Sequence, residues 1–196
     1  VAGDGAGLNG TINYFNQSGS LVMSQNVSLG DGGAFDYAGH EPIGPNAVGM
    51  AQFIPSSSAA NYYIQTTRYF YEGGFTAKQN FYSAFSIPDR PPTGAVITAR
   101  ISRQSGETSV IETVNGSSSA SLANINAFNA AGSQTFHDAV TIQPKATYHR
   151  VVDGSILPAN AEGTASISGA IESISAITVI YRTNSGGQLL YGFAPP

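Results

Sequence analysis

The sequence contains no cysteine and no tryptophan, and only 10 % of its 196 residues are charged. The absence of cysteine excludes disulfide bonds and metal sites built on thiolate ligands. Eight Lys and Arg residues against twelve Asp and Glu residues give a net charge of −4, which disfavours nucleic-acid binding. Coiled coils and helix bundles depend on abundant Glu and Lys, which are scarce here. No apolar run approaches the roughly 18 residues of a membrane-spanning helix.

The polarity of the chain comes instead from hydroxyl and amide groups. Ser, Thr, Asn and Gln make up 59 residues, and glycine adds 23. Such groups can be buried between subunits with hydrogen bonds, whereas buried charges must be paired at a desolvation cost. The composition therefore favours a self-assembling structural protein over a monomeric enzyme.

Alternation of apolar and polar residues, the pattern of half-buried strands, dominates the sequence. Turn dipeptides such as Asn115-Gly116 and Asp153-Gly154 separate the alternating runs. We predict an all-β fold, an antiparallel β-sandwich or jelly roll, with an extended N-terminal segment over 1–20 and one sandwich domain over 21–196. The expected strands lie at 21–29, 95–102, 108–114, 148–152, 177–181 and 189–193, with a further short strand ending at Ile142, and the pair 177–181 and 189–193 is predicted to form a C-terminal hairpin.

Two stretches do not show a strand pattern. Residues 30–58 contain Gly32-Gly33 and three prolines, which predicts a long irregular excursion. Residues 117–132 carry Leu122, Ile125 and Phe128 three positions apart, which suggests a short helix ending near Gly132.

The sequence offers little for catalysis or for metal and cofactor binding. His40, His137 and His149 are scattered, and the acidic neighbours Glu41 and Asp138 would point to the opposite face of a strand. No nucleophile elbow, zinc-protease helix or phosphate loop is present. Asp31 and Asp36 lie in a glycine-rich stretch, but without the spacing of a calcium loop. We therefore predict no enzyme activity, no cofactor and no metal.

Aromatic residues are concentrated in one part of the chain, since 62–85 hold nine of the twenty. Adjacent strand residues face opposite ways, so one core does not easily bury them all. Three interpretations remain open: an interface between subunits, a strand buried on both faces, or a surface that stacks on sugar rings. The predicted interface residues are Tyr62, Tyr63, Tyr69, Phe70 and Tyr71.

The N-terminal segment 1–20 is a candidate donor strand that completes a sheet in a neighbouring subunit. Its apolar anchors would be Leu8, Ile12, Tyr14 and Phe15. Four Asn-x-Ser/Thr motifs, at Asn9, Asn16, Asn26 and Asn115, are candidate glycosylation sites of an exported chain.

Together these features predict an extracellular, pilus-like filament subunit that polymerises with copies of itself by strand addition and aromatic burial. A glycan or a host surface is a further candidate partner, and neither nucleic acid nor a transmembrane segment is expected. The alternatives are a virion structural protein, such as a jelly-roll capsid, decoration or fibre subunit, and a lectin-like carbohydrate-binding module.

Overall fold

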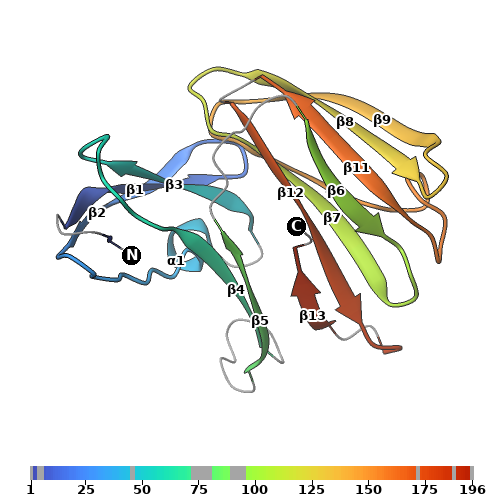
Figure 1. Cartoon of the computed structure of the whole chain (residues 1–196), viewed down its shortest axis with the longest axis horizontal. Coiled ribbons are helices and arrows are strands. Elements are labelled where there is room, and N and C mark those ends of the chain that lie inside the picture. The colour runs from blue at the N-terminus through green and yellow to red at the C-terminus, as the bar shows by residue number, and fades with distance from the viewer. Residues whose placement is uncertain are drawn as a thin grey trace.

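The computed structural model describes residues 2–3, 7–44, 47–71, 81–88, 96–170, 173–186 and 189–194, without the side chains at 40, 71, 81–83, 85 and 88. Within these ranges the chain forms thirteen strands, all paired antiparallel, and one four-residue helix (Figure 1). The elements in order are β1 Leu8–Asn16, β2 Leu21–Leu29, α1 His40–Ile43, β3 Gly49–Pro55, β4 Gln65–Tyr71, β5 Phe81–Pro88, β6 Ile97–Ser102, β7 Glu107–Asn115, β8 Ser121–Asn129, β9 Gln134–Ile142, β10 Thr147–Val151, β11 Glu162–Gly169, β12 Ile174–Thr183 and β13 Leu189–Phe193.

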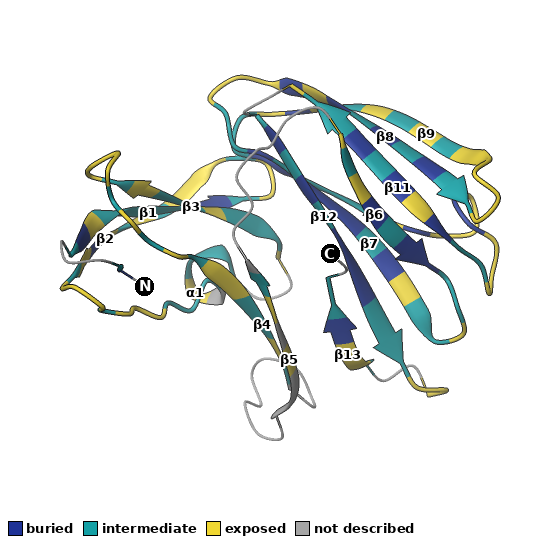
Figure 2. Cartoon of the chain, in the orientation of Figure 1, coloured by how far each residue is buried: buried dark blue, intermediate teal, exposed yellow. Residues whose placement is uncertain are grey.

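The C-terminal half of the chain is a sandwich of two four-stranded sheets. One sheet has the strand order β10-β7-β12-β13 and the other the order β6-β11-β8-β9. Alternate residues of both sheets meet in one apolar core, which includes Ile101, Ile111, Ile125 and Ile167, each at most 1 % exposed. Figure 2 shows the buried residues gathered on these strands. The predicted all-β antiparallel sandwich is confirmed.

Buried hydroxyl groups join the two sheets of the sandwich where β6 lies against β7 and β12. Ser109 Oγ accepts a hydrogen bond from the backbone N–H of Ser102 at 2.7 Å and donates to its carbonyl at 3.0 Å. Thr178 Oγ1 donates to the carbonyl of Arg100 at 2.9 Å. Ser109 and Thr178 are fully buried. Their neutral hydroxyl groups make these hydrogen bonds without a counter-ion, which a charged side chain buried at the same place would require.

A separate three-stranded sheet, with the order β2-β1-β3, lies beside the sandwich, and the β4-β5 hairpin lies between them (Figure 1). The β1–β2 turn reaches the sandwich, where the carbonyl of Gln17 accepts a hydrogen bond from the N–H of Thr147 at 3.1 Å. Gly19 in this turn has a φ of +89°, and a Cβ there would lie 2.1 Å from the carbonyl oxygen of Pro144. The close approach of the two parts therefore requires glycine at this position.

Most strands predicted from alternation are observed, including β2 at Leu21–Leu29 and the C-terminal hairpin of β12 and β13. The helix predicted over 117–132 is wrong, because this stretch contains strand β8. Ala123, Ile125 and Ala127 alternate into the core, whereas Leu122, one of the three residues that suggested a helical face, is 51 % exposed. The stretch 30–58, predicted to be irregular, contains α1 and β3.

Candidate functional site

Among the described sheets, β2-β1-β3 stands out because none of its strands contains a charged residue. One face of the β1–β2 pair carries a ladder of polar cross-strand pairs. Ser28 Oγ donates to Asn9 Oδ1 at 2.7 Å, Thr11 Oγ1 to Asn26 Oδ1 at 3.2 Å, and Ser24 Oγ to Asn13 Oδ1 at 2.6 Å. Each pair is directly opposed in the register of the two strands, so the ladder follows from the alternation of both sequences.

The opposite face of this sheet is packed by the segment that follows β2. Tyr14 is 3 % exposed, and its ring lies 5.2 Å from that of Tyr37. The hydroxyl of Tyr37 donates to the sulfur of Met23 at 3.6 Å. Burial, together with the neighbouring Tyr37, raises the pKa of Tyr14 to about 12. This face is therefore a small core of its own.

The structure places the predicted donor segment inside its own chain. β1 is the central strand of the sheet, paired with β2 on one side and with β3 on the other. Leu8, Tyr14 and Phe15 are buried, and Ile12 is partly buried. The predicted boundary at residue 20 falls in the turn between two paired strands. Both edges of β1 are paired, so a donor role would require the exchange of both pairings. The edges of this sheet that have no partner strand among the described residues belong to β2 and β3.

The predicted aromatic residues are divided between buried and exposed positions. The ring of Tyr62 packs edge-to-face against Phe53 at 5.1 Å, and Phe70 packs edge-to-face against Tyr181 at 6.2 Å. Tyr63 and Tyr69 are 55 % and 59 % exposed. The side chain of Tyr71 lies outside the described residues, as do the rings of 75, 81, 82 and 85. The aromatic stretch thus contributes both to internal packing and to the surface.

A partly buried ion pair fixes the β4-β5 hairpin to the sandwich. Arg68 on β4 donates to both carboxylate oxygens of Glu112 on β7, at 2.7 and 2.5 Å, and also to the hydroxyl of Tyr181 on β12 at 2.7 Å. Burial alone would lower the pKa of the Arg68 guanidinium, but the hydrogen bonds and charge of Glu112 raise it above its usual value. This two-pronged geometry is the strongest form of an ion pair between side chains.

His149 lies opposite Glu112 on the neighbouring strand β10. Burial lowers the pKa of His149; the Glu112 carboxylate opposes this shift and the Arg68 guanidinium reinforces it. Burial also raises the pKa of Tyr181. The carboxylate of Glu112 is engaged on both oxygens by arginine, so it is poorly suited to act as a general base. We interpret the cluster as a structural clamp.

The remaining cations of the described residues are also engaged within the chain. Arg100 pairs with Glu162 at 2.8 Å, Arg182 with Glu107 at 3.3 Å, and Arg150 with Asp153 at 3.8 Å. Arg103 and Lys145 donate to the backbone carbonyls of Leu157 and Gly116. Lys78 and Arg90 lie outside the described residues. The described surface therefore offers no cluster of unpaired cations for a polyanion.

The four glycosylation candidates differ sharply in access. Asn9 and Asn26 lie on the exposed polar ladder, and Asn16 is partly exposed in the β1–β2 turn. Asn115 is fully buried, and the two hydrogens of its Nδ2 are shared among the carbonyls of Ser119, Ile142 and Gln143, at 2.8, 2.9 and 3.2 Å. Its Oδ1 accepts from the N–H and the hydroxyl of Ser117. A glycan on Nδ2 would replace these bonds and does not fit the folded chain.

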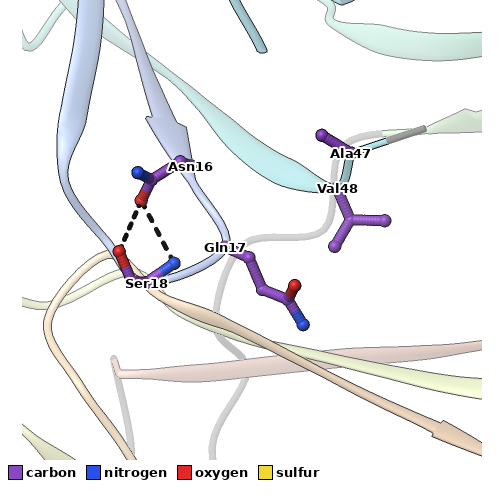
Figure 3. Close-up of a pocket in the computed structure, with 5 residues that line it drawn as sticks. All are labelled: Asn16, Gln17, Ser18, Ala47 and Val48. Carbon is purple, nitrogen blue, oxygen red and sulfur yellow. Dashed lines mark hydrogen bonds between the residues drawn. The ribbon is translucent and has the colours of Figure 1, made fainter. Parts of the chain in front are cut away.

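An open depression of about 550 Å³ lies beside the β1–β2 turn (Figure 3). It is lined by Asn16, Gln17, Ser18, Ala47 and Val48. Asn16 Oδ1 accepts hydrogen bonds from the N–H and the hydroxyl of Ser18, so its carbonyl is used to hold the turn. The lining offers neither a charged group nor a deep apolar wall, which are the usual features of a small-molecule site.

The histidines do not converge where they can be described. His137 is exposed on β9, and its Nδ1 lies 2.9 Å from Asn126 Oδ1, whereas His149 is on the other sheet of the sandwich. Among the described residues no three His, Asp or Glu side chains are grouped to hold a metal ion. The described part of the chain has one helix, of four residues, which is too short to cross a membrane.

Sequence reasoning missed the Arg68–Glu112 clamp and the polar ladder. A signal for the clamp was present, since Glu112 is a single charge between Val110-Ile111 and Thr113-Val114. Such a residue in a strand buried on both faces requires a counter-ion, and Arg68 is the only charge in β4. The ladder depends on the register of β1 against β2, which composition does not give.

Comparison with known proteins adds little to this description. No family model and no curated protein matches the chain. Among solved structures, the Anabaena sensory rhodopsin transducer is similar over 46 % of this chain and 99 % of its own, with 13 % sequence identity and a TM-score of 0.36. A similarity of this size supports no statement about function. The class that the structure itself defines is an all-β, sandwich-like protein with an additional uncharged sheet.

Proposed function

We propose that this protein is a structural, self-assembling subunit of an extracellular filament, and that its subunits associate by β-strand addition together with burial of aromatic side chains. The observation that carries the proposal is the β2-β1-β3 sheet, which combines uncharged strands with two outer edges that pair with no other described strand. Natural proteins usually protect such edges with charges, prolines or covering segments, because an open edge pairs with other chains.

The placement of β1 changes how strand addition would work. Because β1 is already paired on both sides, the groups available for new backbone hydrogen bonds are on the outer edges of β2 and β3. Subunits would then extend one another's sheets from the edge, as in other cases of strand addition. A free N-terminal donor is not required.

The surface chemistry of the rest of the chain is consistent with burial in an assembly. The described cations are satisfied internally, so subunits can approach without burying an unpaired cation from this part of the chain. The exposed side chains of Tyr69, on β4, and Tyr63, just before β4, supply aromatic surface of the kind that is enriched in protein interfaces. Exposed apolar residues on the edge strands themselves, Leu21 at 56 %, Val22 at 42 % and Ile54 at 48 %, add to this area.

Size-exclusion chromatography with light scattering over a concentration series, followed by negative-stain electron microscopy, tests this proposal. Filaments that grow with protein concentration support it. Closed shells would instead favour the virion alternative. A monomer at all concentrations would overturn both, and binding of the Tyr63 and Tyr69 surface to a glycan array would then test the lectin alternative.

A further inference from the structure

The β2 strand differs from the other edge strands in the described part of the chain. β6, β9, β10 and β4 each carry a charged residue, namely Arg100, Asp138, Arg150 and Arg68, and β13 has only five residues. β2 has nine residues, no charge and no proline, and its backbone makes no hydrogen bond to a described segment other than β1. β3 and β5 are also uncharged, but β3 has seven residues and ends at Pro55, and β5 ends at Pro88 and lies against β13. β2 is therefore the least protected edge.

The sequence of β2 is nearly symmetric in polarity about its middle residue, Gln25. An antiparallel pairing of two β2 strands centred on Gln25 would place like beside like. The facing residues would be Leu21 with Leu29, Met23 with Val27, Ser24 with Asn26, Val22 with Ser28, and Gln25 with its own copy. Only Val22 with Ser28 joins unlike residues, and Val22 lies where the β1–β2 register shifts. Directly opposed residues of like chemistry stabilise an antiparallel pair.

Two further features of the structure match this pairing. Ser24 is bonded to Asn13 and Asn26 to Thr11, so facing Ser24 and Asn26 would join the polar ladders of two subunits into continuous rows. The Oε1 atom of Gln25 is buried and accepts no hydrogen bond from the described residues. Because its own chain covers this atom, the Gln25 side chain would have to turn toward the outer edge of β2 before the carboxamide of the second copy could donate to it.

We infer that β2 pairs antiparallel with β2 of a second copy of this chain about a two-fold axis at Gln25, which joins the two three-stranded sheets into one six-stranded sheet. This contact uses the same surface on both subunits, as a two-fold interface must. The inference rests on the proposed self-assembly and identifies its first step. A glycan on Asn26 would lie where the two β2 strands meet (the β2 seam), so glycosylation of that residue and pairing of the strands exclude each other.

The absence of cysteine makes single-cysteine cross-linking a direct test of the register. In a Gln25→Cys variant the two thiols face each other across the axis, with their Cβ atoms roughly 5 Å apart, and mild oxidation should give a cross-linked dimer. In a Ser28→Cys variant the two thiols are about six residues, or roughly 20 Å, apart along the strands, and no cross-link should form. Equal cross-linking of both variants, or of neither, would overturn the inference.

A matched pair of lysine variants gives an independent test. Ser24→Lys and Asn13→Lys remove the same hydrogen bond and add the same charge to the same face, but only Ser24 is on the edge strand. Sedimentation equilibrium should show the dimer dissociation constant raised at least ten-fold by Ser24→Lys and nearly unchanged by Asn13→Lys. Equal effects of the two variants would contradict the β2 seam.

The outcomes also separate this inference from the proposed function. Cross-linked dimers without any longer polymer would support the β2 pairing and overturn the filament. Filaments that form normally with Ser24→Lys would support self-assembly and overturn the β2 pairing.

Discussion

Replacement of Asn115 by alanine should be among the most destabilising single changes in this chain. The buried carboxamide donates to three backbone carbonyls and accepts two hydrogen bonds from Ser117. These bonds tie the end of β7 to the loops that follow β7 and β9. Each bond contributes about 1 kcal/mol, and buried carbonyls left without a donor add to the loss, so the expected cost is about 3–5 kcal/mol.

Asn129→Ala is the matched control for Asn115→Ala. Asn129 Oδ1 accepts two turn hydrogen bonds, from the N–H groups of Ala131 and Ser133, both at 3.0 Å. Its amide nitrogen donates to no carbonyl within the described residues, and the side chain is only partly buried. The expected loss is about 1 kcal/mol. Equilibrium urea denaturation of the two variants measures both values, and equal losses would refute the argument that the buried donor side of Asn115 holds these loops.

Three further predictions follow from the buried titratable groups. Glu112→Gln leaves Arg68 without its counter-ion and should lower the free energy of unfolding, measured by urea denaturation, by about 3 kcal/mol. Glu162→Gln, which removes an exposed ion pair, should lower it by less than about 1 kcal/mol. Equal losses would contradict the structural role of the Arg68–Glu112 pair. The pKa of His149 is lowered in the folded chain, so the unfolded chain binds a proton at this residue at higher pH than the folded chain does. The free energy of unfolding should therefore fall as the pH drops below about 6.5. His149→Gln should flatten this part of the plot of stability against pH, and an unchanged slope would count against a buried neutral imidazole. The pKa of Tyr14 is raised to about 12, so the stability that its neutral form contributes is complete below about pH 10 and is lost as the pH rises toward 12. A Tyr14→Phe variant whose free energy of unfolding falls as steeply with alkaline pH would contradict this assignment.

The strands could be predicted from the sequence wherever one face is buried and the other is polar. β2 was predicted to the residue because Leu21–Leu29 alternates, and the C-terminal hairpin was predicted because a glycine-rich turn separates two apolar runs. β8 was misread because its inward residues include the small Ala123 and Ala127, which give a weak hydrophobic signal, while the large Leu122 points outward. Outward apolar residues are common, so size alone did not identify the buried face.

The relation between the parts of the chain could not be read from local patterns. The role of β1 as a central strand depends on β3, which lies more than thirty residues away in a stretch rich in glycine and proline. The contact of Arg68 with Glu112 likewise joins residues 44 positions apart. Such pairings depend on topology and register, which local patterns in a single sequence do not reveal. The low charge of the whole chain is evident from its composition, but the gathering of β1, β2 and β3 into one uncharged sheet is not.

The most direct test of self-assembly through an uncharged sheet is negative-stain electron microscopy of the full chain beside its Asn13→Lys and Ser24→Lys variants at equal concentration. The account predicts filaments for the unmodified chain and for Asn13→Lys, and their loss or marked shortening for Ser24→Lys. Isolated monomers in all three samples would contradict the account.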